Sequence, residues 1–258
     1  MQLLVSALNA NIDELILKMN IDSDAIIVNQ CEENSYRDIQ VGAHEVKVYS
    51  FAERGVGLSR NNALLRASAE ICLFSDDDIE YVKNYEKIVE AEFENYPKAD
   101  IILFQFDICP ERKTYDNVGF KRVRWYNCGR YPTFCMAFRT ASVKKSNVTF
   151  SLLFGGGAKY SNGEDSLFLQ ECIKKGLRVY ATQTCLGREE PRESTWFKGY
   201  NEKFFVDRGV LYAFLYGSFA RIFALRFIIK ISKEYRNEMK MSLAYKYISK
   251  GIKLAKKI

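Results

Sequence analysis

Short apolar runs separated by helix-like patterns dominate the first half of the sequence. Near-continuous apolar runs predict buried strands at residues 3–7, 25–28, 46–51, 71–74 and 100–106. Polar and apolar positions interleave as in helices at residues 12–19, 59–67 and 84–96. Runs that do not alternate indicate strands buried on both faces, so we expect a mostly parallel, Rossmann-like sheet flanked by helices.

The pattern of the second half is less regular and ends in helices. It predicts a polar segment at residues 109–130, strands at 133–139 and 177–181, and a helix at 164–175. From residue 201 onward the pattern is wholly helical. We therefore predict a catalytic domain over residues 1–200, with halves 1–108 and 109–200, and a helical extension over residues 201–258.

The charge distribution supports a chain of two parts. The net charge of the whole chain is +6, but from Asp207 to the end there are twelve Lys/Arg and three Asp/Glu, so the remainder carries about −3. The N-terminus has no basic flank followed by an apolar core, so no signal peptide is expected. The seven cysteines are scattered and include no C-x-x-C pair, which argues against a structural zinc site and against a disulfide framework. This pattern favours a location in the reducing cytoplasm.

Three consecutive aspartates, Asp76, Asp77 and Asp78, come one residue after the apolar run that ends at residue 74. In open α/β sheets, ligands bind at the carboxyl ends of strands. Carboxylates there suit Mg²⁺ or Mn²⁺, which are held by one or two carboxylates together with substrate phosphates. A solvated acidic turn before the next helix is the alternative reading.

Sixteen residues before Asp76, the sequence G-V-G-L-S-R places two glycines ahead of Arg60 and a predicted helix. Gly57 would let a ligand approach the backbone, with Ser59 as a possible N-cap, and the helix N-terminus favours anions. Arg60 adds a bidentate phosphate donor. Together with the aspartates, this indicates a site for a diphosphate.

A third acidic group, Glu164 and Asp165, opens a predicted helix after the glycine-rich segment F-G-G-G-A-K-Y-S-N-G. Acidic residues are common in the first turn of a helix for electrostatic reasons alone. The functional alternative is a carboxylate at a pocket edge that takes a proton from a hydroxyl nucleophile.

Taken together, these three motifs resemble those of the GT-A glycosyltransferases of family 2, and the similarity covers roughly residues 1–185. The resemblance implies a GT-A fold, a nucleotide-diphosphate sugar donor and inversion at the anomeric carbon. It further implies that Asp78 and Asp76 bind the metal, that Asp76 and Asp77 lie by the nucleotide, and that Arg60 faces the diphosphate. It assigns the base to Asp165, with Glu164 beside it.

Two positions depart from the family pattern. The first strand ends in S-A-L-N-A, so only Asn9 is carried over as a nucleotide-binding residue. The second strand ends at Asn29, where family members commonly have an aspartate that reads the base. Asn29 is expected to bond the edge of a uracil, which makes UDP the favoured nucleotide.

The sequence therefore predicts a metal-dependent, inverting glycosyltransferase that acts on a glycan or lipid-linked acceptor in bacterial surface polysaccharide synthesis. One alternative is a nucleotidyltransferase acting on sugar phosphates, although no glycine-rich basic loop follows the first strand. Another is a degenerate, membrane-associated scaffold that keeps the fold. Trp196 could stack on an acceptor sugar or pack the last helices onto the body.

The basic C-terminal extension suggests a second partner. The apolar stretch at residues 211–231 is interrupted by three basic residues, so a transmembrane helix is not expected. Lysines at i, i+4, i+7 and i+11 form one helical face: Lys246, Lys250, Lys253 and Lys257. This favours contact of residues 211–258 with an anionic membrane on its cytoplasmic side, and a solvated face is the alternative. Whether the chain forms a homo-oligomer is left open by the sequence. No nucleic-acid partner is expected, because no recognised binding module is present.

Overall fold

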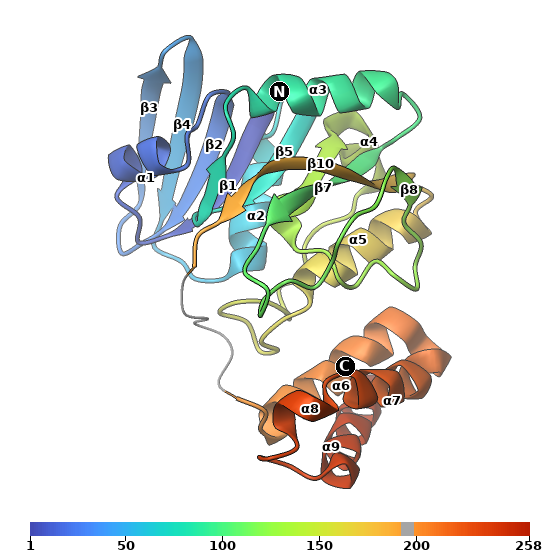
Figure 1. Ribbon diagram of the computed structural model, residues 1–258. Coiled ribbons are helices and arrows are strands. Elements are labelled where there is room, and N and C mark those ends of the chain that lie inside the picture. Colours follow the sequence, from blue (N-terminus) through green and yellow to red (C-terminus); the bar gives the residue numbers. More distant parts are fainter. Residues whose placement is uncertain (192–198) are drawn as a thin grey trace.

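The structure is a computed structural model that describes residues 1–191 and 199–258 (Figure 1). Trp196 lies outside the described residues. The strands are β1 (Gln2–Leu8), β2 (Asp24–Gln30), β3 (Ser35–Val41), β4 (His44–Phe51), β5 (Ile71–Asp76), β6 (Ile79–Tyr81), β7 (Ile101–Asp107), β8 (Lys121–Arg122), β9 (Met136–Arg139) and β10 (Val179–Glu189). The helices are α1 (Ile12–Lys18), α2 (Val56–Arg66), α3 (Tyr85–Asn95), α4 (Thr140–Ser146), α5 (Glu164–Lys174), α6 (Glu202–Tyr216), α7 (Ala220–Lys230), α8 (Ser232–Tyr235) and α9 (Met241–Leu254). Three short 3₁₀ turns are η1 (Thr133–Cys135), η2 (Gly217–Phe219) and η3 (Ala255–Lys257).

The strands form one sheet in the order β3-β4-β2-β1-β5-β9-β7-β10-β6, with β8 paired to β10. The central strands β4, β2, β1 and β5 are parallel, as the buried apolar runs predicted. Both faces carry helices, and the C-terminal helices α6–α9 lie together below the sheet in Figure 1. Because β1, β2 and β5 are neighbours and parallel, their carboxyl ends come to one edge of the sheet.

Several elements differ from the sequence-based expectation. Strand β3 was not predicted, since its side chains are mostly exposed and polar at the sheet edge. Residues 133–135 form η1, so the strand predicted at 133–139 is confined to β9, which runs antiparallel between β5 and β7. Ser59 does not cap α2: the N-cap is Gly55, and Ser59 is buried within the helix with its Oγ 2.8 Å from that of Ser6.

The predicted helical C-terminal extension is confirmed, and its two main helices touch backbone to backbone. A Cβ on Gly209 of α6 would lie 2.1 Å from the carbonyl oxygen of Ile248, and one on Gly251 of α9 would lie 2.0 Å from that of Val206. Only glycine permits so close a crossing. The helices α6 and α9 are therefore held in fixed register. The domain boundaries proposed at residues 108 and 200 stay predictions.

Candidate active site

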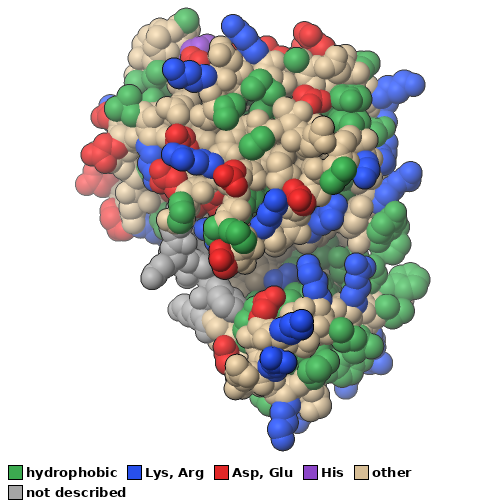
Figure 2. Space-filling model, in the orientation of Figure 1, with side chains coloured by type: hydrophobic (Ala, Val, Ile, Leu, Met, Phe, Trp, Pro, Cys, Tyr) green, Lys and Arg blue, Asp and Glu red, His purple; other side chains and the backbone are tan. Residues whose placement is uncertain are grey.

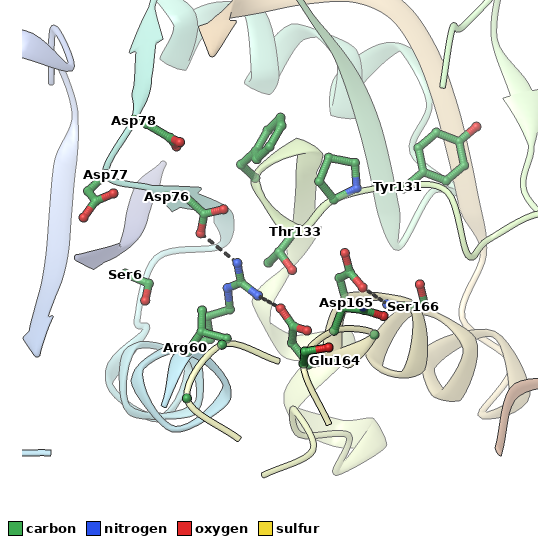
Figure 3. Close-up of a pocket in the computed structure, with 18 of the residues that line it drawn as sticks. Ser6, Arg60, Asp76, Asp77, Asp78, Tyr131, Thr133, Glu164, Asp165 and Ser166 are labelled. Carbon is green, nitrogen blue, oxygen red and sulfur yellow. Dashed lines mark hydrogen bonds and ion pairs between the residues drawn. The ribbon is translucent and has the colours of Figure 1, made fainter. Parts of the chain in front are cut away.

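A cavity of about 520 Å³ opens at the carboxyl ends of β1, β2 and β5. The α/β body forms most of its wall, and α6 of the C-terminal extension completes it. Its lining includes Ser6, Asp76, Tyr131 and Asp165, which are labelled in Figure 3. Gln30 and Arg208 also line it. Two segments that are about ninety residues apart in the chain, the aspartate turn and the start of α5, therefore face the same space.

Asp76 ends β5, and Asp77 and Asp78 form the turn to β6. The three residues, called the aspartate turn here, have different surroundings. The carboxylate of Asp77 accepts a hydrogen bond from the Leu8 N–H at 3.0 Å, which fixes the turn against the end of β1. Asp78 is buried, and its carbonyl oxygen accepts from the Glu190 N–H at 2.8 Å. All three line the cavity, so a cluster of negative charge meets whatever binds there.

Arg60 is buried between two carboxylates. Its guanidinium donates to Asp76 at 2.7 Å and to Glu164 at 2.8 Å, drawn as dashed lines in Figure 3. Burial opposes the charge of Arg60, but Asp76 and Glu164 raise its pKa above the ordinary value, so the side chain stays charged. This Asp76–Arg60–Glu164 bridge joins the aspartate turn to the first residue of α5.

Glycine in the preceding loop makes room for this bridge. Gly155 has φ +100°, and a Cβ there would lie 2.7 Å from the Glu164 carboxyl carbon. Glycine is needed both for the backbone conformation and for the space. The glycine-rich sequence motif thus packs against the bridge.

Asp165 follows Glu164 and faces the cavity. Its carboxylate accepts from the Ser166 N–H at 2.6 Å at the start of α5. Burial, and then the neighbouring charge of Glu164, raise the pKa of Asp165 from 3.8 to about 7. A carboxyl group that titrates near neutrality, beside a cavity, has the property required of a general base.

The remaining predicted nucleotide-binding residues, Asn9, Asn29 and Gly57, lie around the cavity without lining it. Asn29 is buried and bonds the backbone N–H and carbonyl of Ala10 at 3.0 and 3.3 Å. Asn9 accepts from Arg54 at 3.3 Å. Gly57 lets α2 approach another part of the chain, since a Cβ there would lie 2.7 Å from the Ser151 carbonyl oxygen. At the end of β2 it is Gln30 that lines the cavity.

The sequence analysis did not find four arginines of the cavity wall, because none belongs to a local motif: Arg54, Arg112, Arg130 and Arg208. Arg54 is paired with Glu32 at 2.8 Å. Arg112 is paired with Glu189 at 2.7 Å, and Arg130 donates to the Tyr131 hydroxyl at 3.0 Å. Arg208 comes from α6, and within the described part of the chain its Nε has no hydrogen-bond partner. A partly buried guanidinium of this kind is suited to bind an anion.

The acidic turn has the chemistry of a divalent-cation site that substrate completes. Among the described residues, no group of three or more His, Cys, Asp or Glu side chains is placed to hold a metal by itself. Mg²⁺ and Mn²⁺ need fewer, since one or two carboxylates act together with substrate phosphates. Asp76 and Asp78 present such hard oxygen atoms to the cavity, so the residues present fit this kind of ion.

Comparison with known proteins bears on the family and the fold. The family model described as glycosyl transferase family 2 matches residues 5–147. No match was found among curated protein sequences. Among solved structures, S. aureus TarS 1-349 in complex with UDP-GlcNAc matches with a TM-score of 0.63 and 16% identity, covering 94% of this chain and 77% of TarS 1-349.

Two further TarS structures match this chain with similar TM-scores and sequence identities. TarS 1-349 in complex with UDP matches with a TM-score of 0.60 and 15% identity, covering 94% of this chain and 76% of that one. The longer S. aureus TarS matches with a TM-score of 0.60 and 15% identity, and the alignment spans 94% of this chain but 46% of TarS. These matches confirm the predicted GT-A type of α/β fold.

Proposed function

Because the chain belongs to glycosyl transferase family 2, we propose that it moves a sugar from a nucleotide-diphosphate donor to a hydroxyl of a glycan or lipid-linked acceptor. UDP-sugar is the favoured donor class, since TarS structures of the same fold hold UDP-GlcNAc and UDP. The role we propose is in bacterial surface polysaccharide synthesis. The observation that carries the proposal is the Asp76–Arg60–Glu164 bridge, which sets the aspartate turn and Asp165 on one cavity.

The proposed reaction is a single displacement with inversion. Asp165 accepts the proton of the acceptor hydroxyl as its oxygen forms a bond to the anomeric carbon. The bond from that carbon to the diphosphate oxygen breaks, and the bonding electrons leave with the nucleoside diphosphate. Asp165 is suited to this role because its raised pKa makes it a stronger base than an ordinary carboxylate.

The leaving diphosphate gains negative charge, and the cavity supplies positive charge to receive it. Arg208 faces the cavity, and its Nε has no hydrogen-bond partner within the described residues. Asp78 and Asp76 would hold a Mg²⁺ or Mn²⁺ ion, which neutralises diphosphate charge when it is bound. Asp77, bonded to Leu8, keeps the turn in place beside the nucleotide.

Nucleotide-sugar binding tests the proposal directly. We expect UDP-sugars to raise the melting temperature more than GDP- or dTDP-sugars, and we expect EDTA to remove that rise. Asp78→Asn should lose the metal-dependent rise, because one of two carboxylates is gone. The matched control is Glu94→Gln, which changes an exposed acidic residue on α3 and should behave as the wild type.

A chain that binds no nucleotide sugar under any metal condition would contradict the proposal. Binding without hydrolysis or transfer would favour the scaffold alternative. Family membership already favours a glycosyltransferase over a nucleotidyltransferase.

The pH profile tests Asp165 as the base. Because its pKa is raised to about 7, the active carboxylate form is lost as the pH falls below 7. We expect the rate of transfer to fall about tenfold per pH unit on that side. Glu164→Gln removes the neighbouring negative charge, which lowers the pKa of Asp165, so the acid limb should move to lower pH. An acid limb that stays in place in Glu164→Gln would rule out this coupling.

A membrane location belongs to the same proposal. We propose that the enzyme works on the cytoplasmic side of the cell membrane, with residues 211–258 toward an anionic lipid surface. The charge of the extension supports this, since residues 208–233 contain no acidic side chain. A homo-oligomer is a further possible state of the chain. Size-exclusion chromatography with light scattering measures the oligomeric state.

A further inference from the structure

The helix α7 carries an apolar face that nothing in the described chain covers. Its opposite side packs inward through Ala220, Ala224 and Ile228, which are buried against the other C-terminal helices. On the outer side Ile222, Leu225 and Ile229 are 66%, 49% and 55% exposed. They stand at i, i+3 and i+7, so they form one stripe along the helix.

Basic side chains border this stripe. At 100° per residue, Arg226 and Lys230 fall on one side of the stripe and Arg221 falls on the other. All three are exposed, and α7 contains no acidic residue. Figure 2 shows hydrophobic and basic side chains together on the lower right of the molecule, where Figure 1 places α7.

Exposed aromatic rings extend the stripe toward the α/β body. The ring of Phe219, in η2, lies 6.4 Å from that of Trp125, which lies 5.7 Å from that of Tyr126. All three side chains are exposed. Trp and Tyr favour the boundary between lipid headgroups and hydrocarbon. The chain then leads from Tyr126 to Gly129 and Arg130 on the cavity wall.

The run Glu202–Lys230 is long and apolar enough to cross a membrane by length and composition. It does not form a single straight helix, because Gly217 has φ +50° and ψ −120° and ends α6. In addition, α6 contributes Arg208 to the cavity and crosses α9 at Gly209. Crossing the bilayer would pull these contacts apart, whereas lying on its surface leaves them intact.

We propose that the outer face of α7, with Phe219, Trp125 and Tyr126, binds the interface of an anionic lipid bilayer. The apolar stripe enters the headgroup–acyl boundary and the flanking basic residues contact phosphates. This specifies the membrane contact of the proposed function, although lipid binding itself does not require catalysis. It also moves the contact away from the lysine face of α9, where Lys250 is paired with Glu202 at 2.8 Å.

The test is sedimentation of the full chain with vesicles. We expect binding to vesicles of phosphatidylcholine with phosphatidylglycerol, weaker binding to phosphatidylcholine alone, and loss of the difference at high salt. The variant Ile222→Ser/Leu225→Ser/Ile229→Ser should bind at least about tenfold more weakly, since it removes three apolar side chains from the contact. The matched control is Leu17→Ser/Leu65→Ser, which changes exposed leucines on α1 and α2 and should bind as the wild type.

Two further measurements separate this surface from its alternatives. Lys246→Gln/Lys253→Gln should keep most of the binding, and loss in this variant alone would assign the contact to α9. Light scattering identifies self-association: a wild-type dimer that the triple serine variant dissociates, without vesicle binding by the wild type, would overturn the proposal. Melting curves and transfer to a water-soluble acceptor should be unchanged in the triple variant, so a failure of the membrane contact is distinct from a failure of the proposed function.

Discussion

Asp165→Asn is expected to lower the turnover of transfer by about 10²–10⁴-fold, the usual contribution of a general base. The amide cannot accept the proton of the acceptor hydroxyl at any working pH. Donor binding should persist, because the aspartate turn and Arg60 are untouched. The measurement is kcat with saturating donor, together with donor affinity by titration calorimetry.

The same variant should fold at least as well as the wild type. The pKa of Asp165 is higher in the folded chain than in the unfolded one, so its ionisation opposes folding as the pH rises from about 4 to about 7. An asparagine carries no such charge and can still accept the Ser166 N–H bond. A loss of activity accompanied by a lower melting temperature would therefore point to damage of the fold and not to loss of a base.

Arg60→Met is expected to destabilise the protein by about 3–5 kcal/mol, the usual effect of removing one partner from a buried ion pair. Methionine fills much of the space but leaves Asp76 and Glu164 without their shared cation. Transfer should also be lost, since these contacts fix the aspartate turn relative to α5. Urea unfolding and the rate of transfer measure the two effects.

Two controls bear on this result. Arg66→Met, on the same helix, removes an arginine that packs on the ring of Tyr49 at 4.5 Å and has no ion pair among the described residues, and it should cost far less. Adding Glu164→Gln to Arg60→Met should recover part of the stability, because one unpaired carboxylate is neutralised. Independent, additive losses in the double variant would contradict the bridge.

The sequence predicted those parts of the site that follow from local pattern. An apolar run that ends in three aspartates placed them at the carboxyl end of a strand, and β5 ends at Asp76. It placed Glu164 and Asp165 at the start of a helix, and α5 begins at Glu164. Buried strands were recognised for the same reason, whereas the polar edge strand β3 gave no signal.

Pairings between distant residues could not be predicted in this way. The contact of Arg60 with Glu164 joins positions 104 residues apart, and it depends on how β5, α2 and α5 pack. Arg208 enters the cavity only because α6 packs under the sheet, and no neighbouring residue marks it as a ligand. Single charged residues acquire such roles from tertiary structure.

The close crossing of α6 and α9 at Gly209 and Gly251 has a geometric consequence. It joins α6 to α9, and the inner side of α7 packs against the same group of helices. The cavity wall at Arg208 and the outer face of α7 therefore belong to the same helical unit. With α7 seated on lipid, the cavity would stand at a constant height above the membrane plane. The enzyme would then select acceptors by distance, favouring those whose hydroxyl lies at that height above their lipid anchor.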